Sequence, residues 1–297
     1  MNSFIYCIDT TYNVPCYLSI QSLIKCSEEF LDIHIIHSNP ASFNKFKNNL
    51  EIKNKKIRIS LYRIEDNFDY PNLEDRHVSM ATYFRLFIGD YINKELKNLI
   101  YIDADAFAIN NFDEIVTKTF EEMNQKNFTI AALDVNNYDN ETRNKPYFNA
   151  GVLFIDYEKW YKNDITKKLK TETQKDFFYH DQDILNNYFK DNFLNMNKWL
   201  NMHVVLEDYV FNQKLIEEEA FFVHYVGKTK PWDLEGLLKL NSVFYHQLVK
   251  EYNNGELFFK KVSYILKIKF LIINFFKILK HDDSIYFFRN ILTSNSI

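Results

Sequence analysis

Glycine and proline are scarce in this chain: each occurs 5 times among 297 residues. The sequence has no linker rich in glycine, serine or proline and no internal repeat, which excludes a string of loosely joined modules. Hydrophobic residues make up 46% of the chain and aromatic residues 17%, so an intrinsically disordered protein is also excluded. We expect one main domain, residues 1–255, followed by a distinct segment, residues 256–297.

Cysteine is rare as well, and its 3 copies, Cys7, Cys16 and Cys26, form no CxxC pair. An odd number of thiols without such spacing is poor material for a disulfide framework and indicates a reducing compartment. The first residues lack the basic and apolar regions of a secretion signal, and no stretch reaches the ~18 charge-free apolar residues of a spanning helix. We therefore expect a cytoplasmic protein. Its formal net charge of −4 excludes general nucleic-acid binding.

Short apolar runs alternate with helical patterns at the start of the chain. Residues 3–8, 31–37 and 57–62 are typical of strands, and residues 15–27 and 41–50 are typical of helices. This order predicts a parallel sheet with helices on both faces. Its right-handed crossovers place ligand sites beyond the carboxyl ends of the strands.

Further elements follow at similar spacing. Residues 98–102 have no polar face and therefore predict a central strand, whereas residues 193–219 carry no clear pattern. The other expected strands are residues 128–133, 148–155 and 220–225, and the other expected helices are residues 79–92, 157–171, 181–190 and 234–252.

Two carboxylates stand directly after the expected central strand, in Asp103-Ala104-Asp105. In an extended backbone, residues two apart project to the same side, so both carboxylates can address one point. A hard divalent cation prefers such oxygen ligands and can bind a diphosphate through its remaining positions. The alternative is an ordinary turn at a strand end, where aspartate is common.

A second group of polar residues lies around the end of the expected strand 220–225. His224 is followed by Gly227, Lys230 and Trp232. Imidazole suits Mn²⁺ as well as softer metals, a glycine allows a phosphate to approach the backbone, and Lys230 supplies a cation for diphosphate oxygens. The alternative is a histidine that is merely hydrogen-bonded at a strand end.

Three further polar groups allow both a functional and a structural interpretation, and they are Asn149-Ala150-Gly151, Asp181-Gln182-Asp183 and Asp9 with Tyr12. The first indicates side-chain hydrogen bonding and a close backbone approach, or a bulge at a strand start. The second indicates a polar cluster at a sugar, or a helix cap with an acid in the first turn. The third indicates a nucleobase pocket, with a carboxylate accepting from a base N–H and a stacked aromatic ring, or an ordinary loop.

Taken in their order along residues 3–235, these motifs resemble glycosyltransferase family 8, whose members use nucleotide sugars and retain the anomeric configuration. Within that family the chain is most similar to bacterial lipopolysaccharide and lipooligosaccharide galactosyl- and glucosyltransferases. The resemblance implies an α/β fold of GT-A type, with a Rossmann-like central mixed sheet, helices on both faces and a C-terminal basic amphipathic helical segment. The matching motifs are Asp9 with Tyr12, Tyr83-x-Arg85-Leu86, Asp103-x-Asp105, Asn149-Ala150-Gly151, Asp181-Gln182-Asp183 and His224-x-x-Gly227-x-x-Lys230-Pro231-Trp232.

The resemblance also assigns roles to individual residues. It implies a site for Mn²⁺ (or Mg²⁺) at Asp103, Asp105 and His224. The residues implied to bind the UDP-sugar donor are Asp9, Thr10, Tyr12, Arg85, Asp103, Ala104, Asp105, Asp134, Asn149, Ala150, Gly227 and Lys230. The residues implied to act in catalysis at the donor sugar are Gln182, Asp181 and Asp183, and those implied to face the acceptor are His77 and Tyr179.

The implied reaction is transfer of galactose or glucose from a UDP-hexose to a glycan or glycolipid acceptor, with lipopolysaccharide or lipooligosaccharide expected. Retention can arise by double displacement, which needs a nucleophile on the face opposite UDP, or by front-side attack. The residue implied over that face is Gln182, whose amide is a poor nucleophile, and its helix neighbour Asp183 is expected to point elsewhere. We therefore favour front-side attack, with a UDP oxygen accepting the acceptor's proton and Gln182 stabilising the cationic sugar.

Other functions stay open at this point. One is a glycogenin-like self-glucosylating enzyme, and another is a catalytically inactive family member that serves as a binding module. A metal-dependent nucleotidyltransferase or phosphatase is disfavoured, because the sequence has no glycine-rich phosphate loop.

The end of the chain differs in composition. Residues 257–281 carry 6 lysines and no acidic residue, and apolar residues separate the lysines. The longest charge-free run, Phe270–Phe276, is too short to span a bilayer. Such a basic amphipathic segment predicts peripheral attachment to the inner face of the cytoplasmic membrane. The alternative is a helix packed on the domain.

Overall fold

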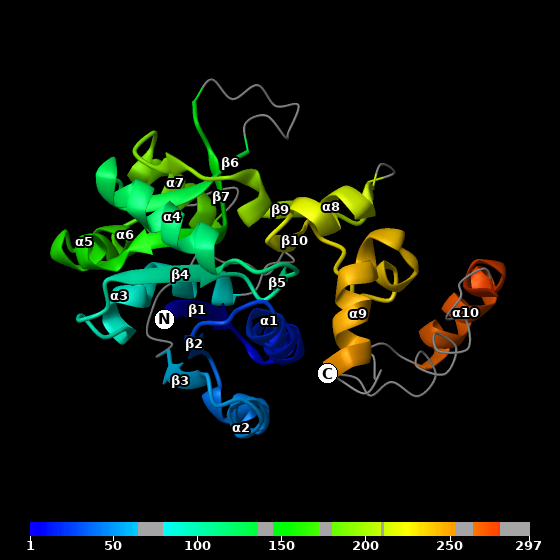
Figure 1. Cartoon of the computed structure of the whole chain (residues 1–297). Coiled ribbons are helices and arrows are strands. Elements are labelled where there is room, and N and C mark those ends of the chain that lie inside the picture. The colour runs from blue at the N-terminus through cyan, green and yellow to red at the C-terminus, as the bar shows by residue number, and fades with distance from the viewer. Residues whose placement is uncertain (65–79, 136–144, 173–179, 209–210, 253–263, 280–297) are drawn as a thin grey trace.

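A computed structural model describes residues 1–64, 80–135, 145–172, 180–208, 211–252 and 264–279 (Figure 1). Within these residues a seven-stranded sheet has the order β3-β2-β1-β4-β7-β6-β8, and a smaller sheet has the order β5-β10-β9. The strands of the large sheet are β1 (Asn2–Ile8), β2 (Leu31–His37), β3 (Ile57–Arg63), β4 (Asn98–Ile102), β6 (Ile130–Asp134), β7 (Phe148–Asp156) and β8 (Leu194–Asn195). Those of the small sheet are β5 (Ala106–Ala108), β9 (Met202–Val205) and β10 (Phe222–Val226).

The helices of the described residues connect these strands and cover them. The α-helices are α1 (Asn13–Lys25), α2 (Asn44–Lys53), α3 (Ile88–Tyr91), α4 (Asp113–Gln125), α5 (Tyr157–Lys162), α6 (Ile165–Lys170), α7 (His180–Phe189), α8 (Gln213–Glu219), α9 (Val243–Tyr252) and α10 (Tyr264–Leu279). The 3-10 helices are η1 (Thr10–Tyr12), η2 (Pro40–Phe43), η3 (Met80–Phe87), η4 (Lys198–Leu200), η5 (Gly236–Leu238) and η6 (Leu240–Ser242).

The large sheet is mixed. Strands β1 to β4 run parallel to one another, and β7 runs antiparallel to both β4 and β6. The parallel order expected from residues 3–62 is therefore confirmed for the first half of the sheet. Strand β4 occupies the fourth of the seven places, as the absence of a polar face predicted.

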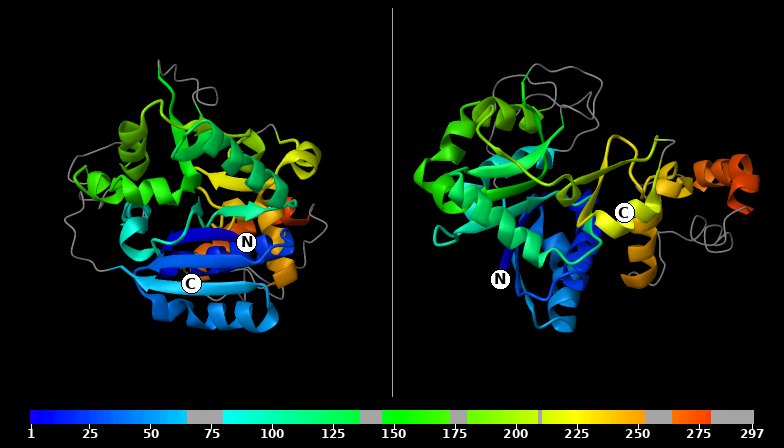
Figure 2. Two further views of the ribbon diagram at one scale, coloured as in Figure 1. Left: turned by 60° about the vertical axis from the view of Figure 1, so that its left-hand side comes forward. Right: turned by 45° about the horizontal axis from the view of Figure 1, so that its top comes forward.

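Helices cover both faces of this sheet because its strands are apolar on both sides. Phe4 and Tyr6 of β1 share one buried cluster with residues of α1, α2 and α4. Ile5, the residue between them, faces the other side and joins a cluster with residues of η3, α3, α5, α6 and α7. The two layers of helices can be followed in Figure 2. The α/β class with helices on both faces, expected from the sequence, is thus confirmed.

Several predicted helices differ from the expectation, because they contain 3-10 turns or are divided into two shorter helices. The described part of the predicted helix 79–92 consists of the 3-10 helix η3 and the short helix α3. A single helix over 157–171 is wrong, because Asp164 adopts a left-handed conformation (φ 50°) that separates α5 from α6. The predicted helix 234–252 begins with two 3-10 turns, η5 and η6, before α9.

Helix α10 lies beyond α9, on the side of the molecule away from α5 and α6 (Figure 1). It buries Lys267 and Leu271, while Ile265, Ile272 and Ile273 are 77%, 71% and 67% exposed. Among the described helices, none combines the length and the apolar character that crossing a bilayer requires.

Candidate metal and donor site

The candidate site lies where the two sheets meet. Strand β4 ends at Ile102, and Asp103-Ala104-Asp105 leads directly from it into β5 of the small sheet. The backbone N–H of Asp103 donates to Gly151 O of β7 (2.8 Å), and Asp105 O accepts from Tyr225 N–H of β10 (3.0 Å). Each aspartate backbone is therefore fixed by a different sheet.

The local conformation differs from the expected one. Ala106 N–H donates to Asp103 O over 3.0 Å, so Asp103 to Ala106 form a turn rather than an extended strand. The prediction that the pleat of a strand aims both carboxylates at one point is wrong in its geometry. The carboxylates still converge, because the turn folds Asp105 back towards Asp103.

Asp103, Asp105 and His224 form a cluster of three groups that could hold a metal ion. One ligand atom from each lies within 4.8 Å of the others. His224 comes from β10, where it pairs with Ala106 of β5, the last residue of the turn. Nε2 of His224 lies 3.3 Å from Asp105 Oδ1 and 3.8 Å from Asp103 Oδ2.

Hydrogen bonds define which nitrogen of His224 carries a proton. The Gly151 N–H donates to Asn149 Oδ1 (2.9 Å), so this atom of the amide is an oxygen. It also accepts from Asn201 Nδ2 (3.0 Å), which leaves Asn201 Oδ1 to accept from His224 Nδ1 over 2.9 Å. Nδ1 therefore carries a proton, and Nε2 is the nitrogen that faces the two carboxylates.

This donor set fits a divalent cation. Asp105 Oδ1 is buried and lies 3.3 Å from His224 Nε2. When Nε2 is unprotonated, both atoms are acceptors, and a metal cation between them would satisfy both. A Cβ at Gly151 would lie 2.1 Å from His224 Cε1 and 2.9 Å from Asp103 Oδ2, so only glycine fits beside the cluster. Two carboxylates and an imidazole suit Mn²⁺ or Mg²⁺.

Arg85 lies beneath the cluster and is 8% exposed. Its guanidinium pairs with Asp103 Oδ1 (3.1 Å) and Asp181 Oδ2 (2.7 Å), and donates to Ala150 O (2.5 Å). The same group stacks on Tyr101, with Cζ 4.3 Å from the ring centroid. Tyr101 in turn donates its hydroxyl to Asp103 Oδ1 (2.5 Å). Arg85 and Tyr101 together hold one oxygen of Asp103 and leave the other towards His224.

Buried charges shift the acidity of this layer. Burial raises the pKa of Asp181 to about 6, and the charge of Arg85 and the hydroxyl of Thr82 offset part of the rise. Burial lowers the pKa of Arg85, but Asp103 and Asp181 raise it more, so the guanidinium stays charged. The pKa of Asp105 is held below its usual range, because Lys230 and His224 outweigh the effect of burial.

A hydrogen-bonded row connects β7 with α7. The Ala150 N–H donates to Gln182 Oε1 (2.9 Å), which fixes the orientation of this amide. Gln182 Nε2 then donates to the Tyr147 hydroxyl (3.2 Å), and that hydroxyl donates to Asp183 Oδ1 (2.6 Å). The expectation that Asp183 points away from Gln182 is too simple, because Tyr147 bonds to both side chains.

The loop after β10 brings Lys230 to the cluster. Gly227 has φ +95°, a conformation that favours glycine, and it turns the chain back towards its own strand. Lys230 Nζ lies 2.7 Å from Asp105 Oδ2 and 2.7 Å from Tyr225 O. Trp232 is buried and meets the ring of Tyr12 edge-on, with centroids 5.8 Å apart. Tyr12 thus lies on the same side of the molecule as this loop.

The remaining predicted residues have simpler surroundings. Asp9 caps η1 by accepting from Thr11 N–H (2.8 Å), and Thr10 is exposed beside it. Asp134 ends β6, where its Oδ1 accepts from Tyr147 N–H (3.3 Å). The two residues predicted to face the acceptor, His77 and Tyr179, lie outside the described residues.

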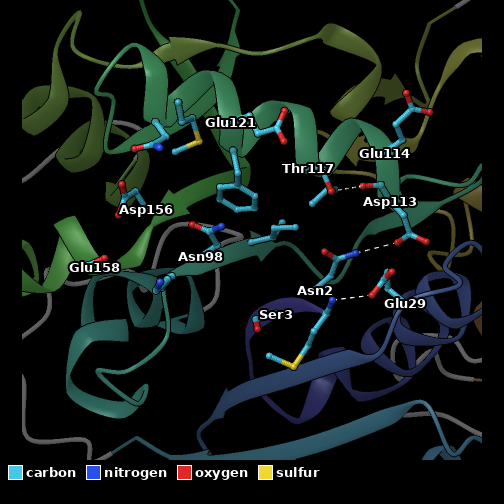
Figure 3. Close-up of a pocket in the computed structure, with 17 residues that line it drawn as sticks. Asn2, Ser3, Glu29, Asn98, Asp113, Glu114, Thr117, Glu121, Asp156 and Glu158 are labelled. Carbon is cyan, nitrogen blue, oxygen red and sulfur yellow. Dashed lines mark hydrogen bonds and ion pairs between the residues drawn. The ribbon is translucent and has the colours of Figure 1, made fainter.

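A cavity of about 740 Å³ lies elsewhere, at the opposite ends of β1 and β4 (Figure 3). Its lining includes Asn2, Asn98 and Asp113, together with the acids Glu114 and Glu121. Asp113 accepts from Asn2 Nδ2 and Ser27 Oγ at 2.9 and 2.7 Å, a structural role. Such an acidic lining repels a diphosphate, so this cavity is not the donor site.

Sequence patterns missed four residues that shape the site: Thr82, Tyr101, Tyr147 and Asn201. Asn201 lies in the segment 193–219 that carried no clear pattern, and only its packing against His224 reveals its part. Tyr101 and Tyr147 each lie two residues before a predicted site residue, Tyr101 within the expected strand 98–102 and Tyr147 just before the expected strand 148–155. Proximity to the motifs was the one available signal for them.

Comparison with known proteins identifies the family of this chain. Residues 3–236 match the family described as Glycosyl transferase family 8. The chain is 28% identical over 251 residues to glycosyltransferase GlyF of Streptococcus pneumoniae, a match that covers 82% of this chain and 60% of that relative. It is 27% identical over 256 residues to a lipopolysaccharide 1,3-galactosyltransferase of Salmonella typhimurium, covering 80% of this chain and 75% of that protein. A lipopolysaccharide 1,2-glucosyltransferase of Escherichia coli K12 is 29% identical over 270 residues, with coverages of 83% and 76%.

The fold agrees as well. The solved structure of galactosyltransferase LgtC with donor and acceptor sugar analogues superposes with a TM-score of 0.66 at 22% identity, covering 84% of this chain and 95% of that one. The protein therefore has the GT-A fold of a glycosyltransferase. With the family matched over most of its length, the chain belongs to glycosyltransferase family 8.

Proposed function

We propose that this protein is a retaining hexosyltransferase that moves galactose or glucose from a UDP-sugar to a glycan or glycolipid acceptor. The observation that carries the proposal is the convergence of Asp103, Asp105 and Nε2 of His224 at the edge of the sheet. Lipopolysaccharide galactosyl- and glucosyltransferases among the relatives support a hexose donor and a lipopolysaccharide or lipooligosaccharide acceptor.

The proposed cofactor is Mn²⁺, with Mg²⁺ as the alternative. Asp103, Asp105 and His224 would hold it, and it would supply Lewis-acid stabilisation of the charge on the departing diphosphate. Arg85 and Tyr101 keep Asp103 oriented, and Asn201 keeps the correct nitrogen of His224 available. The protein's own contribution is thus a set of ligands that needs little rearrangement.

We further propose front-side attack at the sugar. Gln182 has a neutral amide, whose partly negative Oε1 can stabilise positive charge on the sugar ring, and the Ala150 N–H holds that oxygen in place. Asp183 accepts a hydrogen bond from Tyr147, which lowers the nucleophilicity of its carboxylate. A diphosphate oxygen then accepts the proton of the attacking acceptor hydroxyl.

A binding experiment tests the metal and donor parts together. Calorimetry with UDP should give binding in Mn²⁺ and none in EDTA, and Asp105→Asn should weaken the Mn²⁺-dependent binding. Asp191→Asn is the control, because Asp191 is exposed and follows α7. UDP binding that is equally strong in EDTA would refute the metal role of the cluster.

We also propose that α10 attaches the protein to the inner face of the cytoplasmic membrane, as its basic composition predicts. The exposed Ile265, Ile272 and Ile273 support an apolar contact, and the exposed Lys269 supports attraction to anionic lipid. This arrangement would keep the site in the cytoplasm and bring it close to a glycolipid acceptor.

A further inference from the structure

The ammonium group of Lys230 lies on a carboxylate of the metal cluster. Nζ is 2.7 Å from Asp105 Oδ2, and it donates to Tyr225 O at 2.7 Å. The side chains of Lys230 and Asp105 are only 13% and 9% exposed, so water screens this pair weakly. The contact is therefore a strong one, unlike an ion pair on the surface.

The same carboxylate also faces the position of a divalent cation. Asp105 Oδ1 lies 3.3 Å from His224 Nε2, while the other oxygen, Oδ2, carries the lysine. A divalent cation at Asp105 and an ammonium on the same carboxylate would be like charges a few ångströms apart in a poorly screened place. The two cations therefore compete for Asp105.

The loop anchors the backbone of Lys230 independently of the contacts that its ammonium group makes. Lys230 N–H donates to Asp233 Oδ2 (2.8 Å), and Asp233 N–H donates back to Lys230 O (2.9 Å). A Cβ at Gly236 would lie 2.0 Å from Lys230 O, so the loop packs tightly on this peptide. Four methylene groups separate the anchored backbone from Nζ, and rotations about them can carry the charge away from Asp105 without moving the loop.

The net charge of the buried groups indicates when the ammonium group of Lys230 would leave Asp105. The carboxylates of Asp103, Asp105 and Asp181 are matched by two cations, Arg85 and Lys230. Arg85 is enclosed by Asp103, Asp181 and the Ala150 carbonyl. Lys230 instead reaches the cluster from the loop after β10. A divalent cation would turn the net charge of the cluster from −1 to +1 by this count, and a diphosphate would give Lys230 a new anionic partner.

We infer that Lys230 is a built-in competitor of the metal ion, which releases Asp105 only when a diphosphate takes its charge. Metal and nucleotide then bind cooperatively, and each raises the affinity of the other by the same factor. The inference rests on the proposed function, and it adds that Lys230 weakens the binding of the cation alone. A lysine that served only as a phosphate contact would have no such effect.

The test measures Mn²⁺ binding to the full chain by calorimetry or by the EPR signal of free Mn²⁺, with and without saturating UDP. Lys230→Met should bind Mn²⁺ alone about tenfold more tightly than the wild type. The ratio of Mn²⁺ dissociation constants without and with UDP should fall by about the same factor. Lys230→Arg keeps the charge and should keep the weak binding of Mn²⁺ alone.

Two further variants control the result. Lys230→Gln keeps a donor for Tyr225 O without the charge, and it should reproduce the tighter Mn²⁺ binding even where Lys230→Met unfolds. Lys228→Met changes an exposed lysine of the same loop and should leave every constant as in the wild type. If the wild type couples Mn²⁺ and UDP but the neutral variants bind Mn²⁺ alone no better, this inference is overturned and the proposed function stands. If the wild type binds neither, both are overturned.

Discussion

Asn201 determines which nitrogen of His224 faces the metal cluster. Asn201 is fully buried, and its Oδ1 accepts from His224 Nδ1 over 2.9 Å. Its own amide is oriented through Asn149 by the backbone N–H of Gly151. The peptide N–H of Gly151 can only donate, so it fixes the orientation of both amides and, three hydrogen bonds along, the proton on His224 Nδ1.

Loss of this partner should weaken metal binding. We expect Asn201→Ala to lower Mn²⁺ affinity by about 10- to 100-fold, because His224 loses the bond that fixes its tautomer and ring orientation. Mn²⁺ titration in the presence of UDP measures the change. Asn192→Ala, at an exposed position just before this segment, should bind as the wild type does. Equal Mn²⁺ affinity of Asn201→Ala and the wild type would show that Asn201 does not support metal binding.

Gly151 should be required for the cluster itself. A Cβ there would overlap His224 Cε1, so Gly151→Ala should push the imidazole out of place and abolish the rise in melting temperature that Mn²⁺ gives. Gly89→Ala is a matched control, because its Cβ would lie 2.5 Å from Thr166 Oγ1 and its nearest contacts are with Thr166 rather than with the cluster. Both variants should lose about 1–3 kcal/mol from overpacking. Only Gly151→Ala should lose the response to Mn²⁺.

The site was only partly predictable from sequence. Asp103 and Asp105 could be proposed because they follow an apolar strand, where ligand sites are common. His224 was expected at a strand end, but it lies in the middle of β10 (Phe222–Val226). The turn at Asp103 could not be predicted from sequence, because it depends on backbone hydrogen bonds with Gly151 and Tyr225, which belong to two different sheets. Asn201 also escaped, since its segment has short elements, the two-residue β8 and the three-residue η4, that leave no periodic pattern.

The fold was predictable where strands are continuously apolar. The expected strands 31–37 and 98–102 have the bounds of β2 and β4. The break between α5 and α6 was not predictable, because the left-handed residue Asp164 interrupts a sequence pattern that is otherwise helical. The position of Lys230 on Asp105, rather than open towards a ligand, likewise depends on the tertiary turn at Gly227.

The ionisation of Asp181 should set the acid side of the pH–activity profile. Burial raises its pKa to about 6, and Arg85 needs the charged form to stay paired. Because the folded pKa lies above the unfolded value, this group stabilises the fold at low pH, and its contribution is lost as the pH rises through about 6. Activity should instead fall as the pH drops below that value.

A substitution at Thr82 should shift the acid limb of the pH–activity profile that we assign to Asp181. The Thr82 hydroxyl donates to Asp181 Oδ1 over 2.6 Å and lowers the pKa, so Thr82→Val should raise it and shift the acid limb of kcat to higher pH. Thr117→Val changes an exposed threonine of α4 and should leave the profile in place. A limb that stays fixed in Thr82→Val would assign it to another group.

The mechanism can be tested at the two neighbouring side chains of α7. Under front-side attack, Gln182→Ala should lower the transfer rate yet leave it measurable, and Asp183→Asn should keep transfer as well. The reason is that neither residue forms a bond to the sugar in this mechanism. Rates and intact mass after incubation with the donor give the answer. Complete loss of transfer in Gln182→Ala, with a sugar ester trapped on Asp183, would establish double displacement instead.

Attachment by α10 should depend on its apolar face. Ile272 is 71% exposed on this helix, so Ile272→Asp should lower binding to vesicles with anionic lipid by about tenfold or more. Ile52, which is 83% exposed on α2, gives the control, and Ile52→Asp should bind as the wild type does. High salt should weaken the wild-type binding. Binding that neither salt nor Ile272→Asp alters would place attachment elsewhere.

Release of UDP from UDP-galactose and UDP-glucose tests the central claim most directly. The assay compares Mn²⁺ with EDTA, and the presence with the absence of lactose as a mimic of a glycan terminus. The account predicts release that requires Mn²⁺ and that lactose accelerates for one of the two donors. No release from either donor, together with no binding of UDP in Mn²⁺, would contradict it and identify the chain as an inactive member of its family.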